Sequence, residues 1–416
     1  MRATIVISSM RGGGSERVVS HMANYWARHG WPITILTICH GLEAPCYPLD
    51  PRVVHRDMRF SRAAKQPIPS AAALSALKGI FDICSPPERR RLLVELSLVV
   101  ALRRAIAASR PQVVISFINA TNVRTLLAAR GLGLPVIVSE RTDPHRDTLH
   151  EGMRRLRRRL YAQAAYLVCQ TPEIAAFFAR EAGDRTRVIH NPVMPPLVQQ
   201  APDPAAANAV AGPTIVGMGR LVEDKGFSLL LRAFAMVAAK HPSWLLEIWG
   251  EGPQRPRLER LAQNLHLKER VRLPGFTPRP CDVLRRADLF ALSSLSEGFP
   301  NALCEAMACG LAAVSFNCSS GVREIIRDGV DGVIVPAADV SAMAAALDRL
   351  MSSDEDRWRL GARAVEVVQR FAIDKAMSQW EQLALSSVST TVVSTAARAA
   401  DGRVRTSADI RPANVR

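Results

Sequence analysis

The chain has 416 residues, of which 22% are charged and 48% hydrophobic, and it carries a formal net charge of +16. This length exceeds that of one ordinary domain, so two domains of about 200 residues each are expected. The eight cysteines form no C-x-x-C pair and have no histidine at zinc-finger spacing, which argues against a zinc site or a disulfide framework.

The positive charge lies mostly in the first half of the chain. Residues 1–200 carry 28 Lys+Arg against 14 Asp+Glu, a net of +14, whereas residues 201–416 carry 26 against 24, a net of +2. The first half is therefore expected to meet an anionic partner. Nucleic acid, anionic lipid headgroups and a pyrophosphate-bearing substrate all fit this charge.

The N-terminus is a short apolar strand without a signal-peptide pattern, and no apolar run reaches about 18 residues. The sequence therefore predicts a cytoplasmic protein without a membrane span. Apolar runs rich in β-formers alternate with helical patterns, at residues 3–9, 31–38, 111–117, 135–140 and 165–170, and again at 214–219, 244–250, 271–275, 289–294 and 312–316. Continuous apolar strands alternating with helices predict parallel sheets covered on both faces.

The fold class is therefore α/β, with two doubly wound, Rossmann-like domains facing each other across a cleft. We place the N-terminal domain at residues 1–190 and the C-terminal domain at 214–370. Residues 191–213, rich in Pro, Gln and Ala, are predicted to be the linker. A closing helix is expected at 371–385 and a disordered tail at 386–416, where helical periodicity is lost.

Glycine turns follow two of the predicted strands. Glycines 12 to 14 stand between the first strand and a helix, without the G-x-G-x-x-G spacing of a dinucleotide site. After the strand at 214–219, a turn brings together Gly219, Arg220, Lys225 and Gly226. Two cations beside a glycine turn at the carboxyl end of a strand suit a diphosphate, although a solvated loop explains either cation alone.

Two apolar and arginine-rich stretches in the first half have two readings. Residues 88–110 form an apolar helix with arginines at both ends, and residues 153–167 contain five arginines. Either stretch fits contact with an anionic bilayer or a pyrophosphate lipid. Either also fits a helix that covers the sheet and exposes a charged outer face.

The stretch SEGFPNALCEAMACG, residues 296–310, places two glutamates in a strand-loop-helix context. Glu297 lies on the loop after the strand, and Glu305 lies on a helix that starts near Pro300 and stops at Gly310. The carboxyl edge of a parallel sheet is where open α/β folds bind ligands. Glu305 suits a ribose diol, Glu297 suits a second sugar, and the amides of residues 298–301 suit an anion. A helix start with one solvated glutamate is the simpler alternative.

Several of these segments together resemble the retaining glycosyltransferases of the GT-B fold, family 4. The segments that carry the resemblance are GGGSERV, GMGRLVEDKG, IWGEGP, LPGF, SSLSEGFPNALCEAMACG and SSGVREIIRDGVDGVIVP. They lie within residues 4–385. The resemblance implies a nucleotide-sugar donor, such as a UDP-sugar, held mainly by the C-terminal domain, and transfer without a metal or other cofactor.

Carried over position by position, the resemblance implies that Glu297, Arg220 and Lys225 serve catalysis, the last two by holding the leaving diphosphate. Glu305 would bind the donor ribose, Phe276 would lie beside the base, and Gly13 and Gly14 would form the N-terminal wall of the diphosphate site. The other donor-site positions are Gly219, Gly250, Gly298, Phe299, Pro300 and Asn301.

The acceptor side departs from the family pattern. Residues 136–147 end a strand at the cleft where many members have a histidine, but here Arg141 stands at the strand's end and His145 follows later. We place the candidate acceptor site near Arg141 and His145 and near Arg154, Arg155 and Arg158, whose charge suits a pyrophosphate lipid. For His145 a solvated loop position is the alternative.

The form S-E-R-x-D-P resembles the branch that extends lipid-linked oligosaccharides or polysaccharide precursors with sugars such as N-acetylgalactosamine. This implies a peripheral location at the inner face of the cytoplasmic membrane, with an anionic membrane surface as a partner. The acidic run at 354–356 follows Ser353 and is interpreted as the first turn of a helix rather than a metal site.

Two other functions remain open at this point. An inverting transferase or sugar-nucleotide epimerase fits the same fold but lacks the paired glutamates in this context. A basic nucleic-acid-binding protein fits the charge, but few aromatic residues accompany the arginines at 154–159 and no nucleic-acid-binding motif is present. We therefore expect no nucleic-acid partner.

Overall fold

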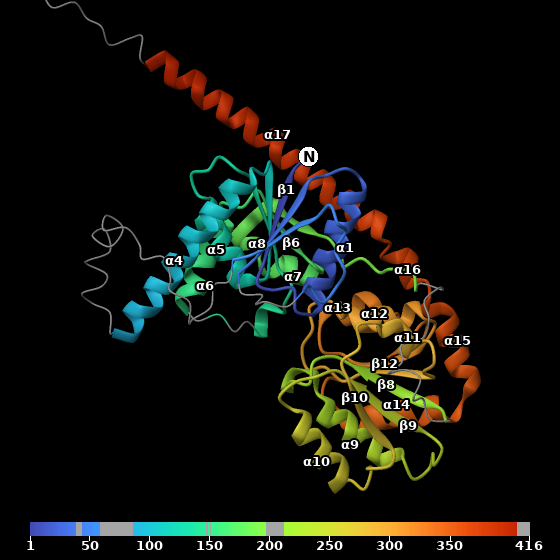
Figure 1. Ribbon diagram of the computed structural model, residues 1–416. Coiled ribbons are helices and arrows are strands. Elements are labelled where there is room, and N and C mark those ends of the chain that lie inside the picture. Colours follow the sequence, from blue (N-terminus) through green and yellow to red (C-terminus); the bar gives the residue numbers. More distant parts are fainter. Residues whose placement is uncertain (39–43, 59–85, 147–148, 150, 197–211, 406–416) are drawn as a thin grey trace, which may run out of the picture.

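The computed structural model describes residues 1–38, 44–58, 86–146, 149, 151–196 and 212–405. These residues form two parallel sheets, one from each half of the chain (Figure 1). Separate hydrophobic clusters lie on the two faces of each sheet, so both sheets are covered on both sides. The prediction of two doubly wound α/β domains is confirmed.

The N-terminal sheet has the strand order β3-β2-β1-β4-β5-β6-β7. Its strands are β1 (Ala3–Ile7), β2 (Ile33–Thr37), β3 (Val54–Asp57), β4 (Val113–Phe117), β5 (Val136–Ser139), β6 (Tyr166–Cys169) and β7 (Thr186–Val188). The helices of this domain are α1 (Gly14–Arg28), α4 (Pro86–Ser109), α5 (Asn119–Ala129), α6 (Glu151–Tyr161), α7 (Pro172–Phe177) and α8 (Ala179–Ala182).

The C-terminal sheet has the order β10-β9-β8-β11-β12-β13. Its strands are β8 (Thr214–Met218), β9 (Leu245–Trp249), β10 (Val271–Gly275), β11 (Leu289–Leu292), β12 (Ala312–Phe316) and β13 (Val333–Val335). Its helices are α9 (Phe227–Val237), α10 (Arg255–Asn264), α11 (Pro280–Leu284), α12 (Asn301–Ala308), α13 (Ser320–Ile325), α14 (Val340–Ser352), α15 (Asp354–Ala364) and α16 (Val367–Arg370).

All ten predicted strands are present, and the structure adds three that the sequence pattern did not reveal, namely β3, β7 and β13. These three lie at sheet edges. An edge strand pairs on one side only and tolerates charged residues, as in the segment VHRD of β3. The continuous apolar signal of a central parallel strand is therefore missing from it.

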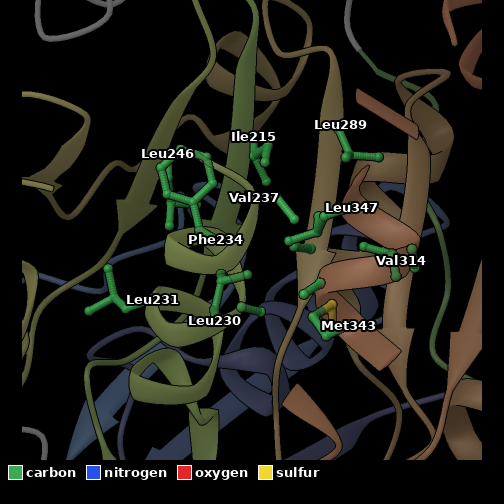
Figure 2. Packing of buried hydrophobic residues seen from close by; sticks show 14 of the residues in the cluster. Ile215, Leu230, Leu231, Phe234, Val237, Leu246, Leu289, Val314, Met343 and Leu347 are labelled. Carbon is green, nitrogen blue, oxygen red and sulfur yellow. The ribbon is translucent and has the colours of Figure 1, made fainter. Parts of the chain in front are cut away.

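The apolar face of α9 packs against the C-terminal sheet and the neighbouring α14. Leu230, Leu231 and Phe234 are fully buried in this cluster, together with Met343 and Leu347 of α14 (Figure 2). Spacings of three and four residues place such side chains on one helix face. This packing fixes where α9 begins, and hence where the loop before it, residues 219–226, meets the cleft.

The structure settles the alternatives for the apolar helix of the first half. Leu98, Leu102 and Ile106 of α4 are buried, and the last two pack in one cluster with β1, β2 and β4. The sheet-covering interpretation is therefore correct for this part of α4. Among the described residues, no helix is both long enough and apolar enough to cross a membrane.

The chain's last helix, α17 (Ile373–Arg405), corrects the predicted disordered tail. It continues from residue 385 to Arg405, and Ser387 is still buried. Met377, Trp380 and Ala384 pack into the core of the N-terminal domain, so the chain returns to that domain and then extends beyond it (Figure 1). The sequence did not reveal this extension because residues 386–405 lack an apolar stripe. Residues 406–416 lie outside the described part.

Candidate active site

The cleft lies where strand order reverses in both sheets. β1 adjoins β4, and β8 adjoins β11, so two neighbouring loops diverge at the carboxyl end of each pair. Such switch points are the ligand-binding positions of open α/β sheets. The glycine loop 12–14 follows β1, while the loops 219–226 and 293–300 follow β8 and β11.

Lys225 and Glu297 come from these two C-terminal loops and meet directly. Lys225 Nζ donates to Glu297 Oε1 at 2.5 Å, and Ser294 Oγ donates to the same oxygen at 2.7 Å. The two charged side chains are 22% and 12% exposed. This pair fixes the Lys225 cation beside the Glu297 carboxylate, which lines a cavity of ≈ 160 Å³.

Gly226 explains how the two loops approach so closely. Its φ is +59°, and a Cβ there would lie 2.0 Å from the Ser293 carbonyl oxygen. Only glycine fits this position without displacing backbone. Ser293 Oγ donates to the Lys225 carbonyl at 2.9 Å, which holds the loops together.

Helix α12 carries the second glutamate. Pro300 precedes its first residue, Asn301, and the helix ends before Gly310, as the sequence predicted. Glu305 faces the N-terminal domain and forms an ion pair with Arg17 of α1, and the Glu305 side chain is 17% exposed. Phe299 is buried beside His190 and Phe371, so its ring is not available to a ligand.

Asn301 links the two domains through hydrogen bonds. Its Nδ2 donates to the Gly14 carbonyl at 3.0 Å, and its Oδ1 accepts from Asn191 Nδ2 at 2.7 Å. Asn191 Oδ1 in turn accepts from Arg141 at 2.5 Å and from Gln170 at 3.0 Å. This polar chain crosses the cleft from the glycine loop to the end of β6.

Gly298 allows the loop 293–300 to touch the N-terminal domain. A Cβ at this position would lie 2.3 Å from Gln170 Oε1 and 2.6 Å from the Arg141 carbonyl oxygen. The close approach therefore depends on the missing side chain. Gly298 packs between the domains instead of lining open space.

The remaining donor-site positions lie around the same edge. Gly219 directly follows β8, Arg220 is exposed, and Gly250 follows β9 with the Gly219 carbonyl against its Cα. Phe276 follows β10, is 53% exposed and lies near Gly12 of the N-terminal loop. The structure thus gathers the predicted donor residues, with Gly13 and Gly14 across from them.

Arg141 requires a correction. It was predicted as an acceptor contact, but its side chain is buried, lies 4.7 Å from the Phe117 ring centroid and also packs over Trp380. Burial lowers the pKa of its guanidinium to about 9. Its hydrogen bond to Asn191 makes it part of the domain junction, and no acceptor can touch its head group in this arrangement.

His145 lies at the mouth of the cavity that contains Glu297. The cavity is formed by the turn after β5, the start of α7 and the loop before α13, including Asp143, His145, Glu173, Ser320 and Arg323. Arg323 bridges the domains by donating to Glu173 at 2.5 Å. His145 is exposed, and its ring contacts Phe177.

The arginines of α6 do not line this cavity. Arg154 and Arg155 pair with Glu151, and Arg158 lies 4.0 Å from Glu181. Their side chains are 43%, 75% and 63% exposed, whereas Arg157 is buried over the Phe178 ring. The helix therefore covers the domain with one face and presents cations on the other.

Three residues of the cleft were missed at the sequence level: Arg17, Asn191 and Arg323. Arg17 and Arg323 belong to segments that carry the family resemblance, GGGSERV and SSGVREII, but nothing in the sequence shows that they pair across domains. Asn191 was assigned to the linker. The acidic run at 354–356 is the first turn of α15, with Ser353 accepting from the Asp356 amide.

Two family models match the chain in separate parts. The model described as Glycosyltransferase Family 4 matches residues 12–195, and the model described as Glycosyl transferases group 1 matches residues 203–367. These ranges correspond to the two sheets and meet in the linker region.

Curated relatives match only part of their own length. The chain is 31% identical over 405 residues to an exopolysaccharide phosphotransferase of Streptomyces coelicolor, covering 89% of this chain and 39% of that protein. It is 34% identical over 143 residues to a Campylobacter jejuni enzyme named as an N-acetylgalactosamine-N,N'-diacetylbacillosaminyl-diphospho-undecaprenol 4-alpha-N-acetylgalactosaminyltransferase, covering 34% of this chain and 38% of that enzyme.

Among solved structures, the Anabaena protein HepE in complex with UDP matches with a TM-score of 0.72 and 18% identity, covering 93% of this chain and 100% of that one. At this identity the match shows the fold, which is GT-B. The chain therefore has the GT-B fold, with an N-terminal domain that matches the Glycosyltransferase Family 4 model and a C-terminal domain that matches the Glycosyl transferases group 1 model.

Proposed function

We propose that the protein is a retaining glycosyltransferase that moves a hexose or N-acetylhexosamine from a nucleotide-sugar to a lipid-linked oligosaccharide or polysaccharide precursor. The observation that carries the proposal is the ion pair of Lys225 and Glu297 on the loops that follow β8 and β11. Glu305 lies on the next helix, α12. The matches of both domains to glycosyltransferase models support the reaction class. The UDP in the HepE complex supports a UDP-sugar as donor.

The chemistry follows from where charge develops. Breaking the bond between sugar and diphosphate leaves a cationic sugar ring and a departing anion, and fixed positive groups near that anion lower the barrier. Arg220 and Lys225 lie on the loop after β8 and supply these charges. Glu297, oriented by Lys225 and Ser294, is assigned to the donor sugar, and Glu305 to the ribose.

The acceptor is assigned to the cavity beside Glu297, between the two domains. His145 and Arg323 are its basic residues, and Asp143, Glu173 and Glu297 are its acidic ones. This mixture suits sugar hydroxyl groups, because both donors and acceptors of hydrogen bonds are available. The diphospho-undecaprenol in the name of the Campylobacter enzyme supports a lipid-linked acceptor.

The exposed arginines of α6 are proposed to meet the anionic membrane surface at which such an acceptor resides. Each Lys or Arg close to an anionic bilayer contributes about 1 kcal/mol to binding. This assigns the protein to the inner face of the cytoplasmic membrane as a peripheral enzyme. The proposal includes no metal ion.

The test measures thermal stabilisation by UDP, GDP, ADP and UDP-sugars, with and without EDTA, on wild type, Glu305→Ala and Glu259→Ala. Glu259 is a half-exposed glutamate of α10 in the same domain and serves as the matched control. One nucleotide should raise the melting temperature of wild type and of Glu259→Ala but not of Glu305→Ala. Stabilisation that EDTA abolishes would contradict metal-independent binding.

Failure of every nucleotide to stabilise the wild type would reject the donor site. Binding to duplex DNA that is stronger than binding to anionic vesicles at the same salt concentration would instead favour a nucleic-acid-binding protein.

A further inference from the structure

The first turn of α1 lies over the residues assigned to the donor. Arg17 forms an ion pair with Glu305, and the Gly14 carbonyl accepts a hydrogen bond from Asn301 at 3.0 Å. Both partners belong to α12, and both face the cleft. A single turn of the N-terminal domain therefore covers the side of α12 that a nucleotide would use.

Glu305 is closed off by this contact. Its Oε1 pairs with Arg17, and its Oε2 is buried without a hydrogen-bond partner among the described residues. An unsatisfied buried acceptor costs about 1–3 kcal/mol. A vicinal diol offers two O–H donors, one for each oxygen, and can therefore satisfy the oxygen that Arg17 leaves without a partner.

Arg17 has a second partner within its own domain. Its guanidinium donates to the Tyr47 hydroxyl at 3.2 Å and lies 4.9 Å from the centre of the Tyr47 ring. Arg17 can therefore leave Glu305 without becoming unpaired. The ion pair to Glu305 is the exchangeable contact, and the contact with Tyr47 is the anchor.

We propose that the first turn of α1 is a latch that occupies the donor site when no nucleotide is bound, and that the ribose of the donor displaces Arg17 from Glu305. This inference rests on the proposed function. Arg17 is a positioning residue of the N-terminal domain, through which donor binding is coupled to the contact between the domains. Domain contact and nucleotide binding then compete for the same carboxylate.

The experiment compares wild type, Arg17→Gln, Arg17→Lys and Arg28→Gln. Arg28 is exposed at the other end of α1, so its variant removes the same charge from the same helix. Calorimetric titration with UDP, GDP and ADP should show at least fivefold tighter binding of the preferred nucleotide to Arg17→Gln, a smaller gain for Arg17→Lys, and wild-type affinity for Arg28→Gln.

Unchanged or weaker nucleotide binding by Arg17→Gln, while wild type binds, would overturn the latch and leave the proposed function intact. If wild type bound no nucleotide, the proposed function would fail, and the displacement of Arg17 by ribose with it.

Discussion

The two domains contribute to the cleft in different ways. In the C-terminal domain, Lys225, Glu297 and Glu305 lie on short segments directly after β8 and β11. In the N-terminal domain, Arg17 and Arg141 also follow strands, β1 and β5, but their head groups meet partners from distant segments: Glu305 for Arg17, and Asn191 and Trp380 for Arg141. Short contiguous motifs therefore position the residues proposed for catalysis and donor binding. The docking of the two domains positions the residues of the N-terminal domain that contact them.

The difference extends to charge. The N-terminal half carries nearly all of the net positive charge, yet Arg17 and Arg141 at the cleft are paired or buried, and a row of exposed arginines lies on α6. The C-terminal half is nearly neutral and holds the two cations assigned to the diphosphate. Net charge is thus informative about surface partners and uninformative about the site of chemistry.

The strongest test of this division is Lys225→Met. Loss of the cation beside Glu297 removes charge from the proposed leaving-group site, and we expect kcat to fall about 10²- to 10³-fold, by analogy with the loss of one transition-state donor. The measurement is UDP release from whichever UDP-sugar the binding panel selects. Nucleotide affinity should change far less than kcat.

Lys240→Met is the matched control. Lys240 is an exposed lysine of the same domain, 2.9 Å from Asp348 and away from the cleft. It should retain wild-type turnover. A fall in kcat below tenfold for Lys225→Met would remove Lys225 from the proposed chemistry and weaken the contrast between the domains.

The next effect concerns the membrane. Changing Arg154, Arg155 and Arg158 together to Ser should reduce binding to vesicles with 30% anionic lipid by ten- to a hundredfold, at about 1 kcal/mol per cation and with partial compensation by neighbours. Vesicle sedimentation at two salt concentrations measures this, and the salt dependence should weaken in the variant.

The control for that experiment comes from the other domain. Arg349, Arg359 and Arg363 have side chains 54%, 52% and 54% exposed on α14 and α15. Changing these three to Ser removes the same charge but should leave vesicle binding unchanged. Equal loss in both triple variants would mean that total charge, and not the N-terminal surface, determines membrane contact.

The contrast between the domains also explains what the sequence could predict. The strand-loop-helix placement of Glu297 and Glu305 followed from an apolar run, a Pro at a helix start and a Gly at its end, all of them local signals. The ten predicted strands, nine of them inside the sheets and β10 at an edge, followed from apolar segments. Each of these features is determined by residues that are neighbours in sequence.

The contacts of Arg17, Arg141 and Asn191 could not be predicted in this way. The sequence places Arg141 at a strand end, where it is a candidate acceptor contact. Its burial was not predictable, because it depends on Trp380 of the last helix, which packs into the N-terminal domain. Asn191 looked like a linker residue, because its partners Asn301 and Gln170 lie 110 and 21 positions away. Tertiary docking leaves no local pattern in the sequence.

The smallest expected effect is a loss of stability of the N-terminal domain at acid pH. Burial, with the nearby charge of Arg17, lowers the pKa of His21 on α1 from 6.5 to about 4. Between pH 4 and pH 6.5 the unfolded chain binds more protons at His21 than the folded chain does. The free energy of unfolding is therefore unaffected by His21 above pH 6.5 and decreases as the pH falls from 6.5 toward 4. We expect a loss of about 2 kcal/mol, after allowing for partial exposure.

Hydrogen exchange of the amides in α1 and α9, at pH 7 and pH 4.5, separates the two domains in this test. Protection of α1 should fall more at pH 4.5 than protection of α9, and His21→Gln should narrow that difference. His29→Gln, at the exposed end of the same helix, should behave as wild type. The same loss in His21→Gln as in wild type would mean that other groups cause the acid sensitivity. His21 lies four residues after Arg17 on α1. Such a result would therefore also indicate that the acid sensitivity of α1 does not depend on the contact between Arg17 and Glu305.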